Sequence, residues 1–132
     1  MLRLSFSNIL VFLAVLVSLT TFFGQNQLTF YLTFLNAELI NGFLNFSSFE
    51  KTYFIDYEFW RLISPIFLHF SVAHLAFNSL WIYVLGTKVE DIEGHKKLII
   101  LILLSGILSN LFESAASERL YLVGYLVVFT VC

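Results

Sequence analysis

Apolar residues fall into three long runs that are separated by mixed or polar stretches. The first run, NILVFLAVLVSLTTFFG, covers residues 8–24, the second covers residues 66–86, and the third, LIILILLSGILSNLF, begins at residue 98. A helix needs about 20 mostly apolar residues to cross the hydrocarbon core of a bilayer. The pattern therefore predicts three transmembrane helices, over residues 8–24, 66–86 and 98–115.

The stretches between these runs have different characters. Residues 25–63 mix aromatic and charged side chains without a long apolar run, which predicts a segment at the membrane interface. Residues 87–97, TKVEDIEGHKK, predict a solvated loop. A polar patch, ESAASER, precedes a last apolar piece, LYLVGYLVVFTVC, which is too short to span and predicts a C-terminal stub. A signal peptide is an alternative for the first run, although no small-x-small cleavage site follows it.

Composition places the chain in the bilayer. Of the 132 residues, 59% are hydrophobic and only 12% are charged, whereas about a quarter of the residues of a soluble domain are charged. We therefore expect an integral, multi-pass membrane protein whose surroundings are lipid. The net charge of −2 and the lack of a basic patch argue against nucleic acid as a partner. The single cysteine excludes an internal disulfide.

The distribution of positive charges predicts the orientation. Residues 87–97 contain three lysines, and Arg3 precedes the first run, whereas the much longer segment 25–63 carries only Lys51 and Arg61. Lysine and arginine near helix ends favour the cytoplasmic side. We therefore expect the N-terminus and residues 87–97 in the cytoplasm.

The second run carries polar side chains that lipid disfavours. His74 and Asn78 are four residues apart and share one face of a helix, and His69 lies just before them. Buried polar groups in a membrane either mark a functional site or bond neighbouring helices together, and the spacing alone leaves both interpretations open. Two histidines without an HExxH pattern or a third ligand make a poor zinc site, so no metal is predicted.

Two other polar features have an ordinary structural interpretation. Small and polar side chains on one face of the third run predict a helix-packing face: Ser105, Gly106, Ser109, Asn110 and Glu113. Trp60 and Arg61 are typical of an interface anchor, in which the arginine snorkels beside an indole.

A family resemblance appears over residues 59–94, FWRLISPIFLHFSVAHLAFNSLWIYVLGTKVEDIEG, and the third run that follows. A Trp-Arg pair, then HFS-x-x-H-x-x-x-N, then LG-x-x-x-E, resembles the N-terminal half of rhomboid intramembrane serine proteases. The residues that carry the resemblance are Trp60, Arg61, His69, Phe70, Ser71, His74, Asn78, Leu85, Gly86 and Glu90. The likeness extends over about residues 8–115.

The resemblance implies roles for three side chains of the second run. His74 and Asn78 become oxyanion-hole candidates, and His69 helps to shape the active-site cavity. Acyl transfer places negative charge on a carbonyl oxygen, and fixed side-chain donors in a low-dielectric site stabilise that charge.

The resemblance also implies the fold and its setting. The expected fold is all-α, a rhomboid-like helical bundle reduced to three transmembrane helices and the stub. Trp60 and Arg61 would buttress a membrane-embedded first loop, residues 25–63, and Glu90 would be a structural group at the cytoplasmic end of the second helix. The implied activity is serine-type endopeptidase cleavage of transmembrane substrates in the bacterial inner membrane, without cofactor or metal.

The catalytic dyad of the family is missing. Its serine lies in a G-x-S-G stretch on the fourth helix and its histidine on the sixth, and these 132 residues contain neither. His95, in a polar loop, cannot replace the base. We therefore expect one partial rhomboid domain, residues 1–132, that is inactive alone. The alternatives are a non-catalytic rhomboid-like membrane binding protein and a small membrane protein whose histidine and asparagine only bond helices together.

The tail, residues 117–132, departs from the family pattern, which has a stretch such as FGGLSG here. A gene read two bases later from Ser117 permits codons that spell FGGLSG. The hypothesis is a frameshift near Ser117 that produced an aberrant tail, and the nucleotide sequence would decide it.

Overall fold

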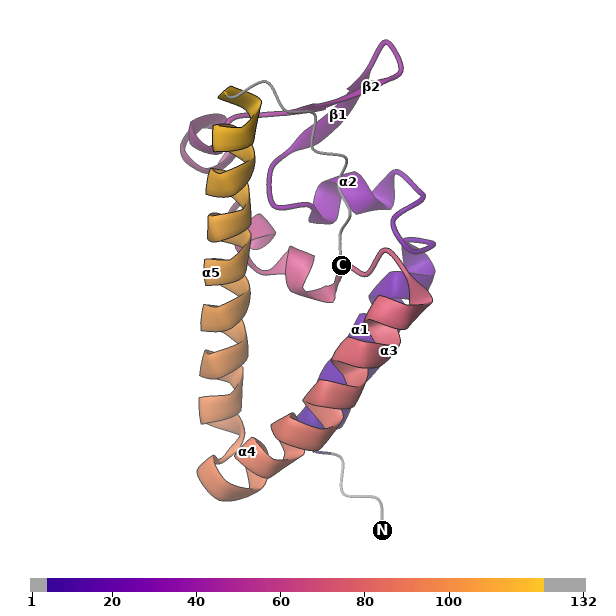
Figure 1. Ribbon diagram of the computed structural model, residues 1–132, viewed down its shortest axis with the longest axis vertical. Coiled ribbons are helices and arrows are strands. Elements are labelled where there is room, and N and C mark those ends of the chain that lie inside the picture. Colours follow the sequence, from indigo (N-terminus) through magenta and orange to yellow (C-terminus); the bar gives the residue numbers. More distant parts are fainter. Residues whose placement is uncertain (1–4, 123–132) are drawn as a thin grey trace.

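The computed structural model describes the backbone of residues 5–122 and the side chains of residues 5–116. The elements, in chain order, are α1 (Phe6–Thr20), α2 (Leu28–Leu32), β1 (Ala37–Ile40), β2 (Phe43–Phe46), the π-helical turn η1 (Lys51–Ile55), the 3₁₀ turns η2 (Phe59–Leu62) and η3 (Ser64–Phe67), α3 (Val72–Trp81), the π-helical turn η4 (Ile82–Gly86), α4 (Thr87–Glu93) and α5 (His95–Leu122). In Figure 1, α1 and α3 lie together, α5 stands apart from them, and α4 joins α3 to α5 at the end opposite the strands.

Helix α1 begins at a capped residue and ends earlier than the sequence predicts. The Ser5 hydroxyl accepts a hydrogen bond from the backbone N–H of Asn8, as N-cap serines do. The helix ends at Thr20, whereas the expected helix covered residues 8–24. Phe22, Phe23 and Gly24 all have positive φ, at 48°, 54° and 85°, and this left-handed backbone stops the helix.

The second helix begins later and ends later than expected. The segment 66–86 was predicted as one helix, but residues 68–71 interrupt it and the α-helix starts at Val72. Residues 72–93 then run without a break through α3, η4 and α4 to Gly94, whose φ is +84°. The prediction of a loop over residues 87–97 is therefore wrong, because these residues contain no helix breaker before Gly94, although most of their side chains are exposed as expected.

Helix α5 includes the expected third helix, residues 98–115, and continues through the polar patch to Leu122. Among the residues described, His95–Ala116 is the one helix long and apolar enough to cross a membrane, and Phe6–Thr20 is a shorter apolar helix. Apolar side chains of α5 such as Leu104 and Phe112 are more than half exposed, as suits contact with lipid. Residues 123–132, with most of the predicted stub and frameshifted tail, lie outside the described residues.

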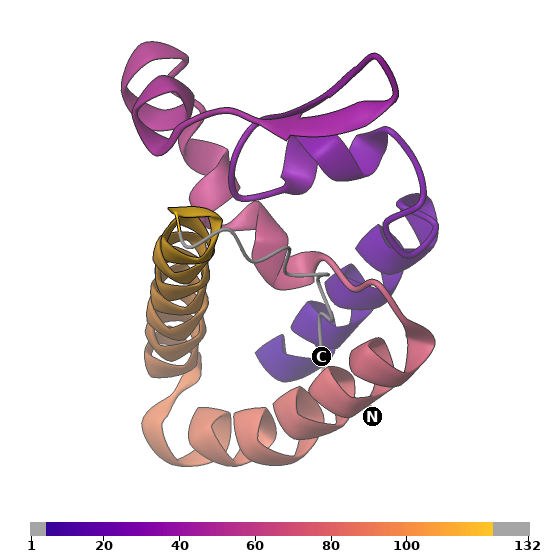
Figure 2. The same ribbon diagram turned by 45° about the horizontal axis from the view of Figure 1, so that its top comes forward.

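The segment between α1 and α3 is not all-helical. Strands β1 and β2 form an antiparallel hairpin in which Ala37 pairs with Phe46 and Ile40 pairs with Phe43. Asn41 and Gly42 make the turn with φ of 53° and 82°, the left-handed pair that a tight hairpin requires. The expectation of an all-α fold is therefore wrong in this detail. Figure 2 shows the hairpin above α2, away from the long helices.

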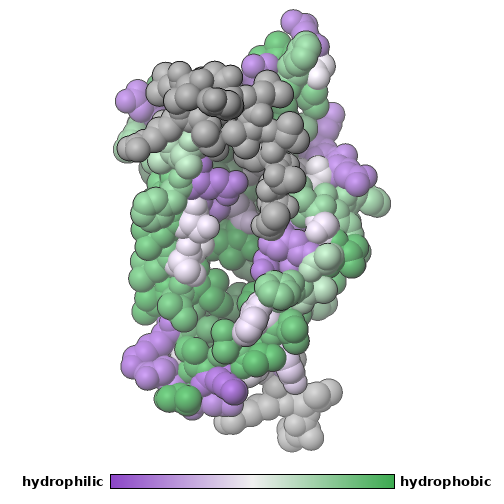
Figure 3. All heavy atoms as spheres, viewed as in Figure 1, coloured by the Kyte–Doolittle hydropathy of each residue, from purple (hydrophilic) through white to green (hydrophobic). Residues whose placement is uncertain are grey.

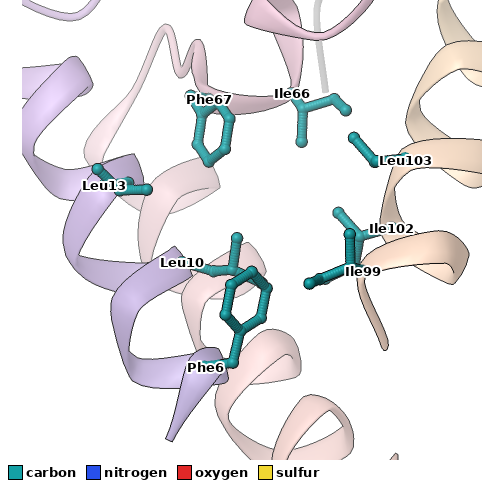
Figure 4. A pocket seen from close by; sticks show the side chains of 8 residues that line it. All are labelled: Phe6, Leu10, Leu13, Ile66, Phe67, Ile99, Ile102 and Leu103. Carbon is teal, nitrogen blue, oxygen red and sulfur yellow. The ribbon is translucent and has the colours of Figure 1, made fainter. Parts of the chain in front are cut away.

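The helices enclose little apolar core. An apolar cavity of about 190 Å³ lies between α1, η3 and α5 (Figure 4), and it is lined by Phe6, Leu10, Leu13, Ile66, Phe67, Ile99, Ile102 and Leu103. Hydrophobic residues instead cover much of the outer surface of the helices (Figure 3). Because no polar group lines the cavity, the candidate chemistry lies elsewhere.

Candidate active site

The three polar side chains of the second apolar run meet at the start of α3. His69 lies in the interruption before the helix, and His74 and Asn78 lie one turn apart on α3. The Asn78 amide nitrogen, Nδ2, is 3.2 Å from Nε2 of His69 and 2.9 Å from Nε2 of His74. The two imidazole rings meet edge to face with centroids 5.0 Å apart. A single amide group therefore bridges both histidines.

The interruption before α3 gives His69 a position that a continuous helix would not. Ser71 caps α3, since its hydroxyl accepts a hydrogen bond from the backbone N–H of His74 at 3.1 Å. The Phe70 ring occupies the space that a Cβ on Gly24 would need, which seats the loop against the end of α1. Ser71 was not predicted as a cap, although a serine directly before an apolar helix is the usual signal.

Helix α1 supplies a fourth member of the site. His69 is 2% exposed, and its Nδ1 lies 3.1 Å from the Phe67 carbonyl oxygen and 3.4 Å from the Ser18 hydroxyl. Ser18 is fully buried and donates to the Ala14 carbonyl at 2.7 Å. Ser18 was not among the predicted site residues, although the Ala14 and Ser18 spacing is the small-residue pattern of close helix contacts.

The cluster offers hydrogen-bond donors rather than a nucleophile. Asn78 carries two amide hydrogens, and Nδ1 of His74 is buried without a partner among the described residues. The Ser18 hydroxyl is buried and donates to the Ala14 carbonyl, and the Ser71 hydroxyl accepts from the His74 backbone N–H as the cap of α3. The arrangement can stabilise negative charge on a bound oxygen atom.

Arg61 does not snorkel into solvent, so its interpretation as an interface anchor is wrong. Its side chain is 1% exposed and donates to four groups at 2.6–3.4 Å: the Glu58 carboxylate, the Phe30 and Thr33 carbonyls and the Asn36 side chain. The Trp60 indole N–H donates to the Tyr31 carbonyl at 3.2 Å. Both residues thereby tie the chain before α3 to the end of α2, with the buried charge satisfied on every side.

Glu90 lies at the other end of the long helix from the histidines and holds the first turn of α1. Its carboxylate accepts hydrogen bonds from the backbone N–H of Phe6 at 2.7 Å, from the backbone N–H of Ser7 at 3.0 Å and from the Ser7 hydroxyl at 2.9 Å. Gly86 permits the approach, since a Cβ there would lie 3.0 Å from the Ser7 hydroxyl. Burial alone would raise the pKa of Glu90, but these donors, with a smaller effect of His95, hold it below its ordinary value.

The polar face expected on the third helix lies apart from the cluster. Gly106 packs against the side chain of Ile66 in η3, and Asn110 Nδ2 is buried without a partner among the described residues. Ser105, Ser109 and Glu113 are exposed. Within the described residues, no group of three or more histidine, cysteine, aspartate or glutamate side chains could hold a metal ion.

Comparison with known proteins gives this arrangement a family. The model of the Rhomboid domain matches residues 56–131, which include Arg61, the histidine–asparagine cluster and Glu90. The chain belongs to the rhomboid family. The matched range also includes residues 117–131, where the sequence analysis predicts an aberrant tail.

Curated rhomboid proteases show the same relationship. Rhomboid protease GluP of Bacillus subtilis (strain 168) is 34% identical over 92 residues, which are 68% of this chain and 18% of GluP. Rhomboid protease GlpG of Salmonella newport (strain SL254) is 40% identical over 63 residues, which are 48% of this chain and 23% of GlpG. The matched part thus spans about a fifth of the length of these rhomboid proteases. No solved structure gave a significant match.

Proposed function

We propose that this chain forms the oxyanion-binding side of a rhomboid intramembrane serine protease domain, with His74 and Asn78 as the side chains that stabilise the oxyanion. The observation that carries the proposal is the convergence of the Asn78 amide on two imidazoles at the start of α3. Donors held in place before the reaction stabilise developing charge without reorganising, and they act most strongly away from water. His69 borders the same space and shapes it.

The setting of this site is part of the proposal. Helix α1, residues 72–86 and the His95–Ala116 part of α5 serve as three transmembrane helices. The N-terminus and Glu90 lie on the cytoplasmic side of a bacterial cell, and residues 25–63 lie at the opposite interface. Exposed apolar side chains on all three helical stretches and on the hairpin support contact with lipid: Phe12, Leu16, Leu44, Phe43, Phe77, Leu80, Leu101 and Leu108. The substrates would be transmembrane segments of other proteins.

These 132 residues are inactive by themselves in this proposal. They contain no G-x-S-G stretch, and Ser18, whose hydroxyl lies 3.4 Å from the His69 ring, is buried and bonded within α1. An oxyanion site without a nucleophile forms no acyl intermediate. Cleavage of a single-span substrate by the purified 132-residue chain would refute this part of the proposal.

A chimaera tests the oxyanion role directly. Residues 1–116 are joined to the part of Salmonella GlpG that follows its matched region, and cleavage of a single-span substrate is measured in liposomes. His74→Ala and Asn78→Ala should each lower kcat about 10²–10³-fold, the usual effect of removing one oxyanion donor. Ser109→Ala, which alters an exposed residue of α5, serves as the control.

The outcome of the chimaera experiment separates the candidate functions. Full activity in both the His74→Ala and Asn78→Ala chimaeras would show that the two side chains only bond helices together. A folded chimaera that retains the substrate without cleaving it would favour the non-catalytic membrane binding protein.

A further inference from the structure

We propose that His69 is a positioning residue that acts through Asn78: it determines which ring nitrogen of His74 carries the proton. The importance of His69 for catalysis rests on the oxyanion role proposed above. The placement of the ring protons is independent of that role. Three hydrogen bonds connect the Phe67 carbonyl to the His74 ring through His69 and Asn78.

The first step fixes the proton of His69. A carbonyl oxygen can only accept, and the Phe67 oxygen lies 3.1 Å from Nδ1 of His69. The other neighbour of Nδ1 is the Ser18 hydroxyl at 3.4 Å, whose own hydrogen is donated to Ala14 at 2.7 Å. Both neighbours therefore accept, and Nδ1 carries the hydrogen of the neutral ring.

The second step fixes the orientation of the Asn78 side chain. With the proton on Nδ1, Nε2 of neutral His69 has a lone pair and needs a donor. The Asn78 atom 3.2 Å from Nε2 must therefore be the amide nitrogen and not the amide oxygen. The two ends of an asparagine amide are otherwise nearly interchangeable in shape, so this contact decides between them.

The third step carries the constraint to His74. The same Asn78 nitrogen lies 2.9 Å from Nε2 of His74 and donates its second hydrogen there. Nε2 of His74 therefore accepts, and the ring proton resides on Nδ1, which is buried and without a partner among the described residues. A substrate carbonyl that enters the site must compete with two imidazoles for the Asn78 hydrogens. His69 thus controls the donors of the site without having to touch the substrate.

Nitrogen NMR of the histidines tests the proposal on the whole chain. The 132-residue protein is labelled with ¹⁵N-histidine, held in detergent micelles at neutral pH, and examined by long-range ¹H–¹⁵N correlation. His69 and His74 should both show a protonated Nδ1 and an unprotonated Nε2. A protonated Nε2 on neutral His69 or His74 would overturn the proposal.

Variants test whether the constraint passes through Asn78. His69→Phe releases the Asn78 amide, so the His74 signals should move towards a protonated Nε2. Ser18→Ala is the matched control, because the Phe67 carbonyl still accepts from His69 and the His74 pattern should not change. An unchanged His74 pattern in folded His69→Phe protein contradicts the relay.

A second variant keeps the test decisive if His69→Phe does not fold. Asn78→Asp presents only oxygen atoms to the rings, so both Nε2 atoms should become protonated, and a retained Nδ1-only pattern would overturn the proposal. These spectra do not depend on proteolysis. A loss of the oxyanion role in the chimaera would leave them unchanged, so the two proposals fail separately.

Discussion

Replacing Glu90 by glutamine removes a negative charge from the first turn of α1 while it keeps the length of the side chain. The wild-type carboxylate uses one oxygen to accept from the Phe6 N–H and the other to accept from the Ser7 N–H and hydroxyl. Glutamine offers one oxygen and an NH₂ group. In its better orientation the glutamine side chain keeps both hydrogen bonds from Ser7. Its NH₂ group then faces the Phe6 N–H, so two donors meet and that hydrogen bond is lost.

The expected loss of stability follows from these contacts. One hydrogen bond to a charged acceptor contributes about 1.5–3 kcal/mol. A carboxylate at a helix N-terminus contributes about 0.3–1 kcal/mol more through the helix dipole. Glu90→Gln should therefore lower the free energy of unfolding by about 2–4 kcal/mol, taken as the sum of these two contributions.

The measurement is unfolding of the purified chain in mixed micelles, followed by far-ultraviolet circular dichroism as denaturing detergent is added. Asp91→Asn is the matched control, since it makes the same change of charge at the next residue, which is exposed. The control should change stability by less than about 0.5 kcal/mol. Equal effects of the two substitutions would refute a specific stabilisation of α1 by the hydrogen bonds of Glu90.

Two further predictions concern the same assay. Hydrogen bonds hold the pKa of Glu90 below its ordinary value. The contribution of Glu90 to the free energy of unfolding is therefore complete above the ordinary carboxyl pKa and is lost as the pH falls through the lowered pKa. Glu90→Gln protein should lack this part of the acid sensitivity. Arg61→Lys should cost about 3 kcal/mol or more, because one ammonium cannot reach all the acceptors of the buried guanidinium. Lys97→Arg, at an exposed cation, should be nearly neutral, and equal effects would show that Arg61 acts only as a charge.

Local patterns predicted the parts of this fold that depend on local chemistry. The i, i+4 spacing placed His74 and Asn78 on one helix face, and the structure has them on α3 with a shared amide contact. The approximate place of each long helix also followed from apolar length. What the pattern could not supply were the ends of the helices, because Thr20 and Val72 are set by left-handed backbone and a serine cap rather than by hydropathy.

Contacts between distant residues account for most of the errors. Residues 87–93 are polar enough for a loop, yet they stay helical and Glu90 meets a partner on α1, more than 80 residues away in sequence. Arg61 looked like an interface residue because the carbonyls that accept its hydrogen bonds belong to Phe30 of α2 and to Thr33, which directly follows α2. The hairpin could have been predicted, because Asn41-Gly42 is a common two-residue turn between strands. The surrounding aromatic residues instead favoured the interpretation as an interfacial segment.

The π-helical turn η4 sets the rotational phase of the long helix. Successive α-helical residues turn by about 100°, so Asn78 and Glu90 would point about 120° apart if residues 72–93 were purely α-helical. The wider turn at residues 82–86 absorbs nearly one extra residue and brings the two directions to within roughly 20–30°. Helix α1 contacts the chain at both ends of this stretch, with Ser18 at His69, just before α3, and Ser7 at the Glu90 carboxylate. Removing a single residue from η4 would force the protein to give up one of these two contacts.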